Sequence, residues 1–406
     1  MRCGLLGRTL GHSYSPQIHR HLGSYSYELF EKEPEQIERF LHSDEFDALN
    51  VTIPYKKSVL PYCDELSPIA QQLGSVNTII RRANGSLIGH NSDYYGFYSM
   101  VMRAKLQLDG KKALVLGTGG AAVTVCAVLN ALNAQVVQIS RSGKNNYGNL
   151  HLHADASVIV NATPVGMYPE TDAAPLDLSI FPKLEGVLDL IYNPAETRLL
   201  AQARKLGLIA ENGLWMLVAQ AFESAQWFTD TPLPEQLIED IYTSLSIQMK
   251  NIILIGMPGC GKSTVGNMLR QLTGRSFIDS DIEIEKEAGM SIPEIFKNQD
   301  EDAFRQLESK VLARICKESG HIIATGGGCV TRPDNYNYLQ QNGNIIWIKR
   351  PLAELSTQGR PLSQKTPIEE MYKIRKPLYE AFSNYEVENT TPEATAAQIV
   401  SLLKGV

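Results

Sequence analysis

Short apolar runs alternate with amphipathic stretches along much of this chain. Between residues 111 and 194, buried strands are predicted by the runs KKALVLG, QVVQIS, SVIVNATP and GVLDLIYNP. A glycine-rich turn and a helical apolar pattern over 120–132 follow the first of these runs. Strands that alternate with helices in this way are typical of α/β domains with parallel sheets.

A second series of apolar runs begins at NIILIG (251–256) and continues through RSFIDSD, HIIATGGG and NIIWIKR. Between the two series, Leu237, Ile241 and Leu245 recur at helical spacing, which predicts a terminal helix that ends near residue 245. Few residues remain as a linker, so we expect a domain boundary near 247–250.

Length and composition agree with a multidomain globular protein. The 406 residues exceed what one hydrophobic core usually supports, and 43% hydrophobic and 20% charged residues are ordinary values. No apolar run reaches the roughly 18 residues of a membrane helix, and the N-terminus lacks the apolar core of a signal peptide. The six cysteines include no C-x-x-C pair, which argues against a disulfide framework and favours a reducing, cytoplasmic location.

The charge pattern bears on the expected partners. The net charge of −6 arises in residues 1–247, which hold 19 Lys and Arg against 25 Asp and Glu, and no long basic run occurs. Nucleic acid and anionic membranes are therefore excluded as main partners, and small anionic ligands must be met by local loops. The pairs His19/His21 and His151/His153 lack a clustered carboxylate or cysteine, so we interpret them as surface histidines.

The segment GMPGCGKST (256–264) fits the P-loop pattern G-x-x-x-x-G-K-[ST] and directly follows a predicted strand. In such a loop, backbone N–H groups and a helix N-terminus surround phosphate oxygens. Lys262 is expected to reach the outer phosphates, and the Ser263 hydroxyl to bind Mg²⁺. The residues expected at ATP are Gly259, Cys260, Gly261, Lys262, Ser263 and Thr264. The alternative, a chance glycine turn, does not account for the complete motif.

Two carboxylates follow the next strand of the second series. Asp279 is a candidate partner of Mg²⁺, and Asp281 a candidate acceptor that orients a substrate hydroxyl as nucleophile. The alternative role for one of them is to cap the helix DIEIEKEAG. Further along, FRQLE, ATGGG, GRPLS and KIRKPLY supply Arg305, Gly327, Arg360 and Arg375.

In this order, GMPGCGKST, FIDSDIEIEKEAGMSIPEIF, FRQLE, ATGGG, GRPL and R-x-PLY resemble shikimate kinase over residues 250–405. The resemblance implies that Arg305 and Arg375 pair with the shikimate carboxylate. It also implies that Asp281 binds ring hydroxyls, that Gly327 contacts the ring through its backbone and that Arg360 belongs to a lid over ATP. Bidentate arginines suit a carboxylate. The lid segment PLAELSTQGRPLSQ is short and lacks an additional arginine that the family often carries.

The first series contains LVLGTGGAAV, in which Gly117, Gly119 and Ala122 match G-x-G-x-x-[GA] between a strand and a helix. This pattern predicts a Rossmann dinucleotide site. The next strand ends in Ser140 and Arg141 instead of the Asp or Glu that holds an NAD ribose, so NADP is favoured.

The polar clusters GHSYSP, NVTIPYKK, GSVNT and HNSDYYG precede the Rossmann unit. Each alone is explained by turns, caps or surface positions. Together with VNATPVGM, DLIYNPAET and GLWMLVAQA they resemble shikimate dehydrogenase across residues 1–245. The resemblance implies a substrate-binding domain (1–100) to which C-terminal helices (212–245) return, an NADP-binding domain (101–211) and, after these, the kinase domain (250–406).

By this resemblance Lys56 and Asp93 form the catalytic pair of the dehydrogenase. In the kinase part, Lys262 and Asp281 are the expected catalytic residues. Lys56 and Asp93 also count among the expected substrate contacts, together with Ser13, Ser15, Thr52, Asn77, Tyr192 and Gln220. The residues expected at NADP are Gly117, Thr118, Gly119, Gly120, Ala121, Ser140, Arg141 and Gly213. Two departures from the family pattern, Tyr94 and Trp215, are expected to add bulk near the cleft and to bear on the choice between shikimate and quinate.

The sequence thus predicts a bifunctional cytoplasmic enzyme of aromatic amino-acid biosynthesis. It would reduce 3-dehydroshikimate with NADPH and then phosphorylate shikimate with ATP and Mg²⁺, and a homo-oligomer is compatible with the sequence. One alternative is a non-catalytic metabolite sensor built from the same folds. Another is a quinate-type dehydrogenase fused to a different small-molecule kinase.

Overall fold

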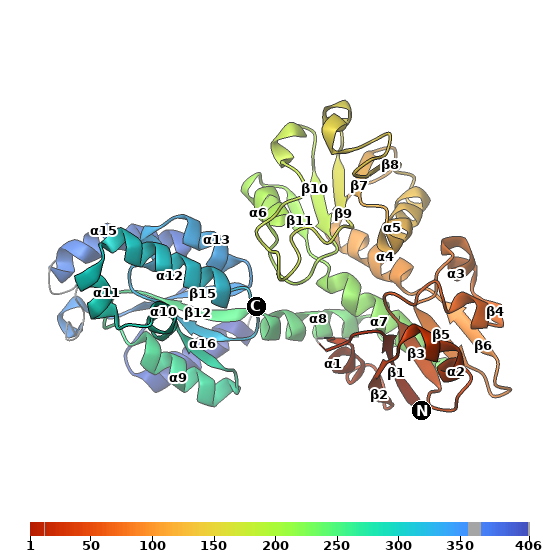
Figure 1. Ribbon diagram of the computed structural model, residues 1–406, viewed down its shortest axis with the longest axis horizontal. Helices are drawn as coiled ribbons and strands as arrows, with labels where there is room; N and C mark the ends of the chain where they lie inside the picture. Colours follow the sequence, from red (N-terminus) through yellow and green to blue (C-terminus); the bar gives the residue numbers. More distant parts are fainter. Residues whose placement is uncertain (12, 356–366, 405–406) are drawn as a thin grey trace. The chain divides into compact units, whose positions relative to one another are not determined.

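The computed structural model describes residues 1–11, 13–355 and 367–404 (Figure 1). The chain forms two compact units. One comprises Met1–Tyr192 and Thr197–Ser244, and the other comprises Asn193–Glu196 and Leu245–Val406. Three separate sheets lie within these units, two in the first and one in the second.

The first sheet is mixed and has the strand order β2-β1-β3-β5-β6-β4. Strand β5 runs antiparallel to β3 and β6, whereas the other neighbouring strands are parallel. Its strands are β1 (Arg2–Gly7), β2 (Ser26–Glu31), β3 (Ala48–Val51), β4 (Glu65–Leu66), β5 (Thr78–Arg81) and β6 (Leu87–His90). The accompanying helices are α1 (Ser15–His19), α2 (Ile37–Leu41), α3 (Pro68–Leu73), α4 (Asp93–Ala104), α7 (Leu214–Thr229) and α8 (Gln236–Met249).

Helix α7 packs against α1, α4 and β5, although it follows them by more than a hundred residues in the chain. Gly96 permits the close approach of α4 and α7. A Cβ at this position would lie 2.8 Å from the carbonyl oxygen of Met216 and 2.9 Å from Cβ of Gln220. The absence of a side chain at one position therefore brings the first turns of both helices together.

The second sheet is fully parallel, as its apolar runs predict, with the order β11-β10-β9-β7-β8. Its strands are β7 (Lys112–Leu116), β8 (Gln135–Ile139), β9 (Val158–Asn161), β10 (Gly186–Asp189) and β11 (Ile209–Glu211). Helices α5 (Gly120–Ala131) and α6 (Arg198–Lys205) accompany it. The predicted helix over 120–132 and all four predicted strands are confirmed.

The third sheet is also parallel, with the order β13-β14-β12-β15-β16. Its strands are β12 (Asn251–Ile255), β13 (Phe277–Asp279), β14 (Ile322–Ala324), β15 (Gly343–Lys349) and β16 (Tyr385–Glu388). Its helices are α9 (Lys262–Thr273), α10 (Ser280–Ala288), α11 (Ile292–Asn298), α12 (Glu301–Ile315), α13 (Asp334–Gln340), α15 (Ile368–Phe382) and α16 (Pro392–Lys404).

Short 3₁₀ helices in the chain are η1 (Pro34–Gln36), η2 (Leu60–Tyr62), η3 (Tyr147–His153), η4 (Leu178–Ile180), η5 (Cys329–Thr331) and η6 (Leu352–Glu354).

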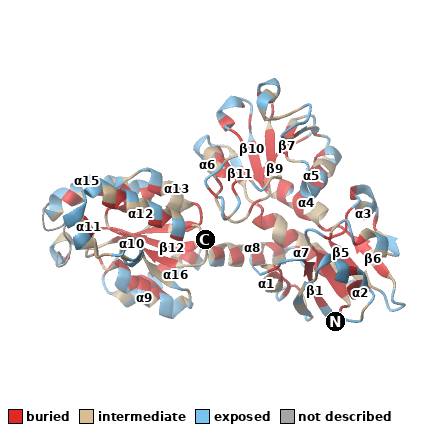
Figure 2. Ribbon diagram, viewed as in Figure 1, coloured by how far each residue is buried: buried red, intermediate tan, exposed pale blue. Residues whose placement is uncertain are grey.

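Buried residues follow the strands and the helix faces that meet them (Figure 2). Strand β12 is buried along its whole length, which fits a central parallel strand covered on both faces. The carboxyl end of β12 leads directly into the P-loop, so the loop begins at a strand that is fixed in the hydrophobic core.

The predicted end of the terminal helix is wrong by one turn. Helix α8 continues to Met249, and β12 begins at Asn251, so only one residue separates them. Leu245 and Met249 are both buried, which extends the apolar stripe. Arg275 donates to the carbonyl oxygens of Ile247 (2.7 Å) and Lys250 (2.6 Å), which satisfies acceptors at the end of the helix. The border between the units, at Ser244 and Leu245, falls inside α8 instead of at 247–250.

The interpretation of His19 as a surface residue is also wrong. Its ring is 1% exposed and stacks on Tyr27 with 4.0 Å between ring centroids. Burial lowers the pKa of His19 to about 3, so the ring is neutral at physiological pH. His19 is thus a core residue of the first unit.

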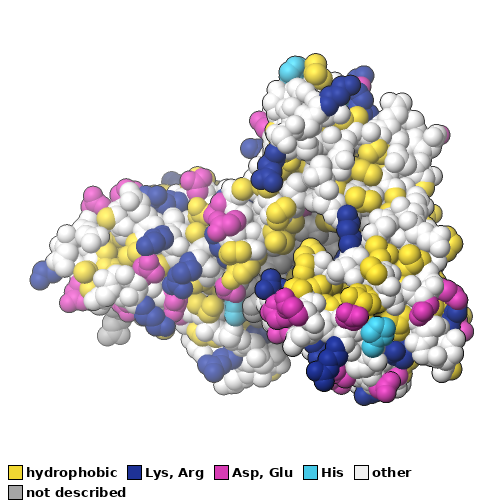
Figure 3. All heavy atoms as spheres, turned by 45° about the vertical axis from the view of Figure 1, so that its right-hand side comes forward, with side chains coloured by type: hydrophobic (Ala, Val, Ile, Leu, Met, Phe, Trp, Pro, Cys, Tyr) yellow, Lys and Arg dark blue, Asp and Glu magenta, His cyan; other side chains and the backbone are white. Residues whose placement is uncertain are grey.

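On the face drawn in Figure 3, Lys and Arg side chains are interspersed with Asp and Glu side chains. This mixture agrees with the lack of a long basic run in the sequence. Within the described residues, no helix combines the length and the apolar character needed to cross a bilayer. All six cysteines are free thiols.

Candidate active sites

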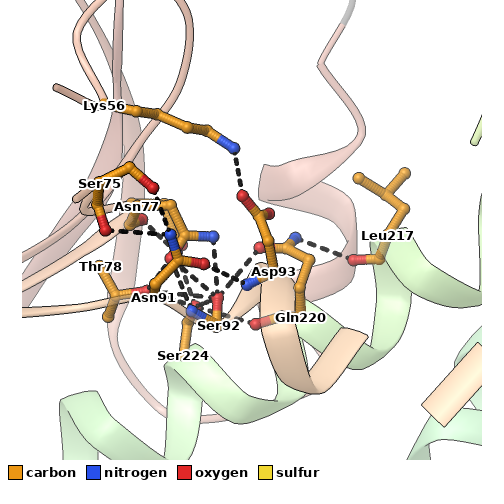
Figure 4. A network of polar contacts seen from close by, with 11 residues as sticks. Lys56, Ser75, Asn77, Thr78, Asn91, Ser92, Asp93, Leu217, Gln220 and Ser224 are labelled. Carbon is orange, nitrogen blue, oxygen red and sulfur yellow. Dashed lines mark hydrogen bonds and ion pairs between the residues drawn. The ribbon is translucent and has the colours of Figure 1, made fainter. Parts of the chain in front are cut away.

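The first site is built around an ion pair between Lys56 and Asp93 (Figure 4). Lys56 lies in the loop after β3, and Asp93 is the first residue of α4. Lys56 Nζ donates to Asp93 Oδ2 at 2.6 Å, and the two side chains are 30% and 15% exposed. The pair is therefore sheltered but reachable, as a proton-transfer pair must be. The structure brings these two predicted residues together.

A buried polar network positions Asp93. The Ser92 N–H donates to Asn77 Oδ1 at 2.8 Å, and Asn77 Nδ2 donates to Ser92 Oγ at 3.0 Å. The Asp93 N–H donates to Asn91 Oδ1 at 3.1 Å. Asn77 is 2% exposed, so its amide directly holds the start of α4. Lys56, Asn77, Asp93 and Gln220 were predicted site residues, whereas Ser75, Thr78, Asn91, Ser92 and Ser224, also drawn in Figure 4, were not.

Helix α7 contributes to the same network. Ser92 Oγ lies 2.8 Å from Ser224 Oγ and donates to Gln220 Oε1 at 3.4 Å. Asn50 Nδ2 also donates to Ser224 Oγ, at 2.8 Å. Ser224 is fully buried and lies 132 residues beyond Ser92, so no local sequence signal could identify it. Gln220 is thereby held next to the segment that carries Asp93.

Three other predicted substrate contacts lie near the N-terminus of α1, namely Ser13, Ser15 and Tyr192. The Ser15 N–H donates to Ser13 Oγ at 3.2 Å, and Ser15 is buried. Between them, the ring of Tyr14 meets the ring of Tyr192 edge-on with 6.2 Å between centroids. Thr52 lies just beyond β3, where its N–H donates to the carbonyl oxygen of Leu6 at 2.9 Å. Thr52 and Lys56 thus share one loop.

The dinucleotide-type turn lies between β7 and α5. Gly117 has φ +109°, and a Cβ there would meet the carbonyl oxygen of Ala162 at 3.0 Å, so this position requires glycine. Gly119 caps α5, and Cβ atoms at Gly119 or Gly120 would meet nothing within 4 Å. The surface at this helix start is therefore open beside both glycines, and a helix N-terminus is a favourable place for a phosphate group. Thr118 and Ala121 lie in the same turn.

The remaining predicted cofactor residues lie at two separate places in the unit, one after β8 and one beside the end of β10. Ser140 Oγ accepts from the Gly143 N–H at 2.7 Å, which turns the loop after β8, and Arg141 in that loop is exposed. Because β8 neighbours β7, this loop lies beside the glycine turn. Gly213 is packed so tightly that a Cβ would lie 2.0 Å from the carbonyl oxygen of Leu190. Because glycine has no side chain, the start of α7 can pack closely against the residue that follows β10.

Trp215 does not occupy the place expected of it. Its indole N–H donates to Ser99 Oγ at 2.8 Å, its ring lies 4.2 Å from the Arg103 guanidinium, and it meets the Tyr242 ring edge-on. Ser99 and Arg103 lie six and ten residues beyond Asp93 on α4, about 9 and 15 Å along the helix axis. Trp215 therefore fastens α7 to α4 and α8, away from the Lys56–Asp93 pair.

The second site is a cavity of about 560 Å³ in the second unit. Residues of the P-loop, the N-terminal part of α10, α12, the loop after β14 and α15 line it. Gly259 and Gly261 adopt left-handed φ values of +85° and +96°. Lys262 Nζ donates to the carbonyl oxygens of Gly256 (2.9 Å) and Met257 (3.1 Å). Cys260 and Thr264 complete the predicted loop, and Thr264 also lines the cavity.

Ser263 and Asp279, the predicted partners of Mg²⁺, are in direct contact. Ser263 Oγ donates to Asp279 Oδ2 at 2.6 Å. Asp279 Oδ1 also accepts from the Asp281 N–H at 3.1 Å, so the capping role holds as well. Among the described residues, no three His, Cys, Asp or Glu side chains are placed so that they could hold a metal ion together. A hydroxyl and one carboxylate suit a Mg²⁺ ion that takes its other ligands from phosphates and water.

Asp281 faces the cavity beside two other carboxylates. The surrounding protein atoms raise the pKa of Asp281 to about 6, and the nearby charges of Asp279 and Glu308 act in the same direction. A carboxylate with this pKa is ionised at pH 7 and can accept a hydrogen bond from a substrate hydroxyl.

Glu308 is a site residue that the sequence reasoning did not single out. Its side chain is fully buried, and Glu308 Oε2 accepts from Arg305 Nη1 at 2.7 Å. Its other oxygen, Oε1, has no hydrogen-bond partner among the described residues, and a Cβ on Gly326 would lie 2.6 Å from it. The signal was present in FRQLE, because residues three apart share one helix face.

Arg375 and Gly327 are also brought together. Arg375 Nη1 donates to the carbonyl oxygen of Gly327 at 3.1 Å, and the Tyr379 hydroxyl donates to the same oxygen. Arg305 and Arg375 both line the cavity together with Asp281. Arg360 lies outside the described residues.

Comparisons with known proteins follow the same division of the chain. The shikimate dehydrogenase substrate binding domain family matches residues 5–79, and the shikimate kinase family matches residues 258–404. The NADP(+) shikimate dehydrogenase of Clostridium perfringens (strain SM101) is 34% identical over 264 residues, which cover 60% of this chain and 97% of that protein.

Two solved structures extend the likeness to three dimensions. A chorismate mutase/shikimate 5-dehydrogenase fusion protein from Clostridium acetobutylicum is 34% identical with a TM-score of 0.58, covering 60% of this chain and 96% of its own. Shikimate 5-dehydrogenase from Thermus thermophilus, in complex with NADP(H) and shikimate, is 30% identical with a TM-score of 0.55, covering 60% and 99%. The chain therefore belongs to the shikimate dehydrogenase family and carries, in its C-terminal region, a domain that matches shikimate kinase.

Proposed function

We propose that this chain is a bifunctional enzyme. It reduces 3-dehydroshikimate to shikimate with NADPH, and it then phosphorylates the shikimate 3-hydroxyl with MgATP. The observation that carries the proposal is that one polypeptide holds a Lys–Asp pair in a dehydrogenase fold and a P-loop cavity with two arginines that suit a carboxylate. In this proposal, residues 1–100 with 212–245 bind the dehydrogenase substrate, 101–211 bind NADP and 250–406 form the kinase.

In the dehydrogenase part, the Lys56–Asp93 pair acts on the oxygen that is being reduced. NADPH supplies the hydride when it is bound. The Lys56 ammonium donates a proton to the developing alkoxide and stabilises its charge, while Asp93 orients the ammonium at 2.6 Å. The substrate carboxylate is held by Ser13 and Ser15. Other contacts to the substrate are assigned to Thr52, Asn77, Tyr192 and Gln220.

The cofactor is held by the glycine turn and by the loop after β8. The N–H groups of residues 117–121 meet the pyrophosphate at the start of α5, where the helix dipole favours negative charge. Ser140 shapes the following loop, and Arg141 meets the 2′-phosphate that distinguishes NADP from NAD. Gly213, at the start of α7, is also assigned to the cofactor, and it packs against Leu190 just beyond β10.

In the kinase part, Lys262 reaches the transferred phosphate, and Ser263 with Asp279 holds Mg²⁺, which neutralises phosphate charge when it is bound. Asp281 accepts a hydrogen bond from the attacking hydroxyl and so orients it. Arg305 and Arg375 pair with the carboxylate of the acceptor. Gly327, whose carbonyl oxygen accepts from Arg375, lies against the ring.

The test supplies the purified full-length chain with 3-dehydroshikimate, NADPH, ATP and Mg²⁺, and identifies the products by mass. We expect shikimate 3-phosphate. Parallel reactions without ATP should stop at shikimate, and reactions that start from shikimate without NADPH should still form the phosphate. Accumulation of shikimate in the complete mixture would contradict the kinase half, and unchanged 3-dehydroshikimate would contradict the dehydrogenase half.

A further inference from the structure

We propose that Arg350 binds the phosphate chain of the nucleotide in the P-loop cavity. This inference rests on the proposed phosphoryl-transfer function and adds a binding residue to it. Arg350 directly follows β15 and lines the cavity together with Gly261, Lys262 and Thr264 of the P-loop. Its location after a strand end, outside the recognised motifs, hid it from the sequence reasoning.

The backbone that carries Arg350 is held against the P-loop. A Cβ on Gly256 would lie 2.4 Å from the carbonyl oxygen of Ile348, so the end of β15 touches the start of the loop. Asn389 makes a second link, because its N–H donates to the carbonyl oxygen of Lys349 at 2.8 Å and its Nδ2 donates to that of Cys260 at 2.7 Å. The base of the Arg350 side chain is thus fixed relative to the phosphate-binding loop.

The order of the strands indicates which ligand Arg350 meets. In the sheet, β12 lies between β14 and β15. Two of the residues proposed to bind the acceptor, Asp281 and Gly327, follow β13 and β14 on one side of β12, whereas Arg350 follows β15 on the other side. Arg350 lines the same cavity as the P-loop, whose backbone N–H groups suit phosphate oxygens, so we assign to it the phosphate chain of the nucleotide and not the carboxylate of the acceptor.

Arg350 is also the cation with the weakest existing attachment. Among the described residues, the other cations that line the cavity are Lys262, Arg305 and Arg375, which are at most 8% exposed and donate to protein oxygens. Arg350 pairs with Glu354 at 3.0 Å, but these side chains are 35% and 54% exposed. A solvent-exposed ion pair contributes little stability, so the guanidinium can exchange Glu354 for a phosphate at low cost. Arginine suits this exchange because it binds phosphate in a bidentate manner.

The neighbouring Lys349 provides a matched control. Successive residues of a strand point to opposite faces, and Lys349 Nζ donates to Glu386 Oε2 at 3.1 Å and lies over the Trp347 ring. Lys349 is not among the residues that line the cavity. It therefore carries the same charge one residue away without access to the proposed ligand.

The experiment titrates the full-length chain with MgADP by calorimetry and measures the KM values of the kinase for ATP and shikimate. For Arg350→Met we expect the dissociation constant of MgADP and the KM for ATP to rise about ten-fold, the loss of one charge-assisted hydrogen bond. Arg350→Lys should keep part of the affinity, the KM for shikimate should not change, and Lys349→Met should match the wild type. Circular dichroism of each variant checks the fold.

Unchanged MgADP affinity in Arg350→Met would overturn the inference, and so would an effect confined to the KM for shikimate. An equal loss of MgADP affinity in Lys349→Met would mean that any nearby positive charge has the same effect, and this result would also overturn the inference. A wild-type chain that binds MgADP without phosphorylating shikimate would contradict the proposed kinase function, yet the ADP titrations would still decide the role of Arg350. A wild-type chain that binds no MgADP would overturn both.

Discussion

Lys56 Nζ lies 2.6 Å from Asp93 Oδ2, although the two residues are 37 positions apart and belong to different elements. The pair is sheltered from solvent, and a buried network through Asn77 and Ser92 holds the segment that presents Asp93. An ammonium held in this way can donate its proton to a nearby oxygen without reorganising first.

Removal of either partner should abolish the dehydrogenase alone. For Lys56→Met and Asp93→Asn we expect kcat for 3-dehydroshikimate reduction to fall by about 10²- to 10⁴-fold, the usual contribution of positioned acid–base groups. The NADPH-linked assay measures this directly. Phosphorylation of added shikimate by the same preparations serves as the control. Dehydrogenase rates close to those of the wild type would remove the catalytic assignment of the pair.

The raised pKa of Asp281 predicts that kinase activity falls at acidic pH. Because this pKa is raised to about 6, the carboxylate becomes protonated as the pH falls through about 6, and it then no longer accepts a hydrogen bond from the hydroxyl. The kcat/KM for shikimate should therefore decline below about pH 6 and level off above it, since kcat/KM reports the free enzyme. A profile that stays flat down to pH 5 would contradict the role of Asp281. In Asp281→Asn the residual rate should lose this dependence.

Arg375→Ala should weaken acceptor binding without affecting the first reaction. A charge-assisted hydrogen bond to the carboxylate contributes about 1.5–3 kcal/mol, so the KM for shikimate in the kinase reaction should rise roughly ten- to a hundred-fold. Dehydrogenase turnover, measured on the same protein, should be unchanged. Equal losses in both activities would mean that the two sites have been assigned wrongly.

Arg141 should discriminate between the two nicotinamide cofactors. Its exposed guanidinium lies in the loop after β8, beside the glycine turn. In Arg141→Ala the KM for NADPH should rise about ten-fold or more, because a charge-assisted contact to the 2′-phosphate is lost. The KM for NADH, which lacks this phosphate, should stay the same and serves as the internal control. If both values rose together, the 2′-phosphate role would have to be abandoned.

Trp215 should matter for stability more than for substrate choice. Its ring packs on Arg103 and Tyr242, and its N–H is paired with Ser99. Trp215→Ala should lower the free energy of unfolding by about 3–5 kcal/mol, measured by urea denaturation followed through dehydrogenase activity. Met102→Ala, at an exposed position of α4, is the matched control and should be close to neutral. Unchanged stability with an altered ratio of shikimate to quinate turnover would restore the expected role in the cleft.

Patterns confined to a short stretch of the sequence determined the elements and the phosphate-binding turns. Apolar runs predicted the buried parallel strands, because a strand covered on both faces needs apolar side chains throughout. The glycine spacings around Gly117 and Gly261 predicted the two turns, because a left-handed backbone or a close approach largely restricts a position to glycine. Such requirements are local, so they are legible without knowledge of the fold.

Tertiary structure decided the features that depend on what a side chain meets. Three such features are the burial of His19 against Tyr27, the hydrogen bond from Trp215 to Ser99 and the contact between Ser224 and Ser92. Each depends on residues from different elements that meet only in the folded chain. Arg350 lines the same cavity as the P-loop because β15 lies next to β12. Burial and pairing arise when distant segments pack together, and this packing sets the direction of each side chain, the partner it finds and the dielectric around it.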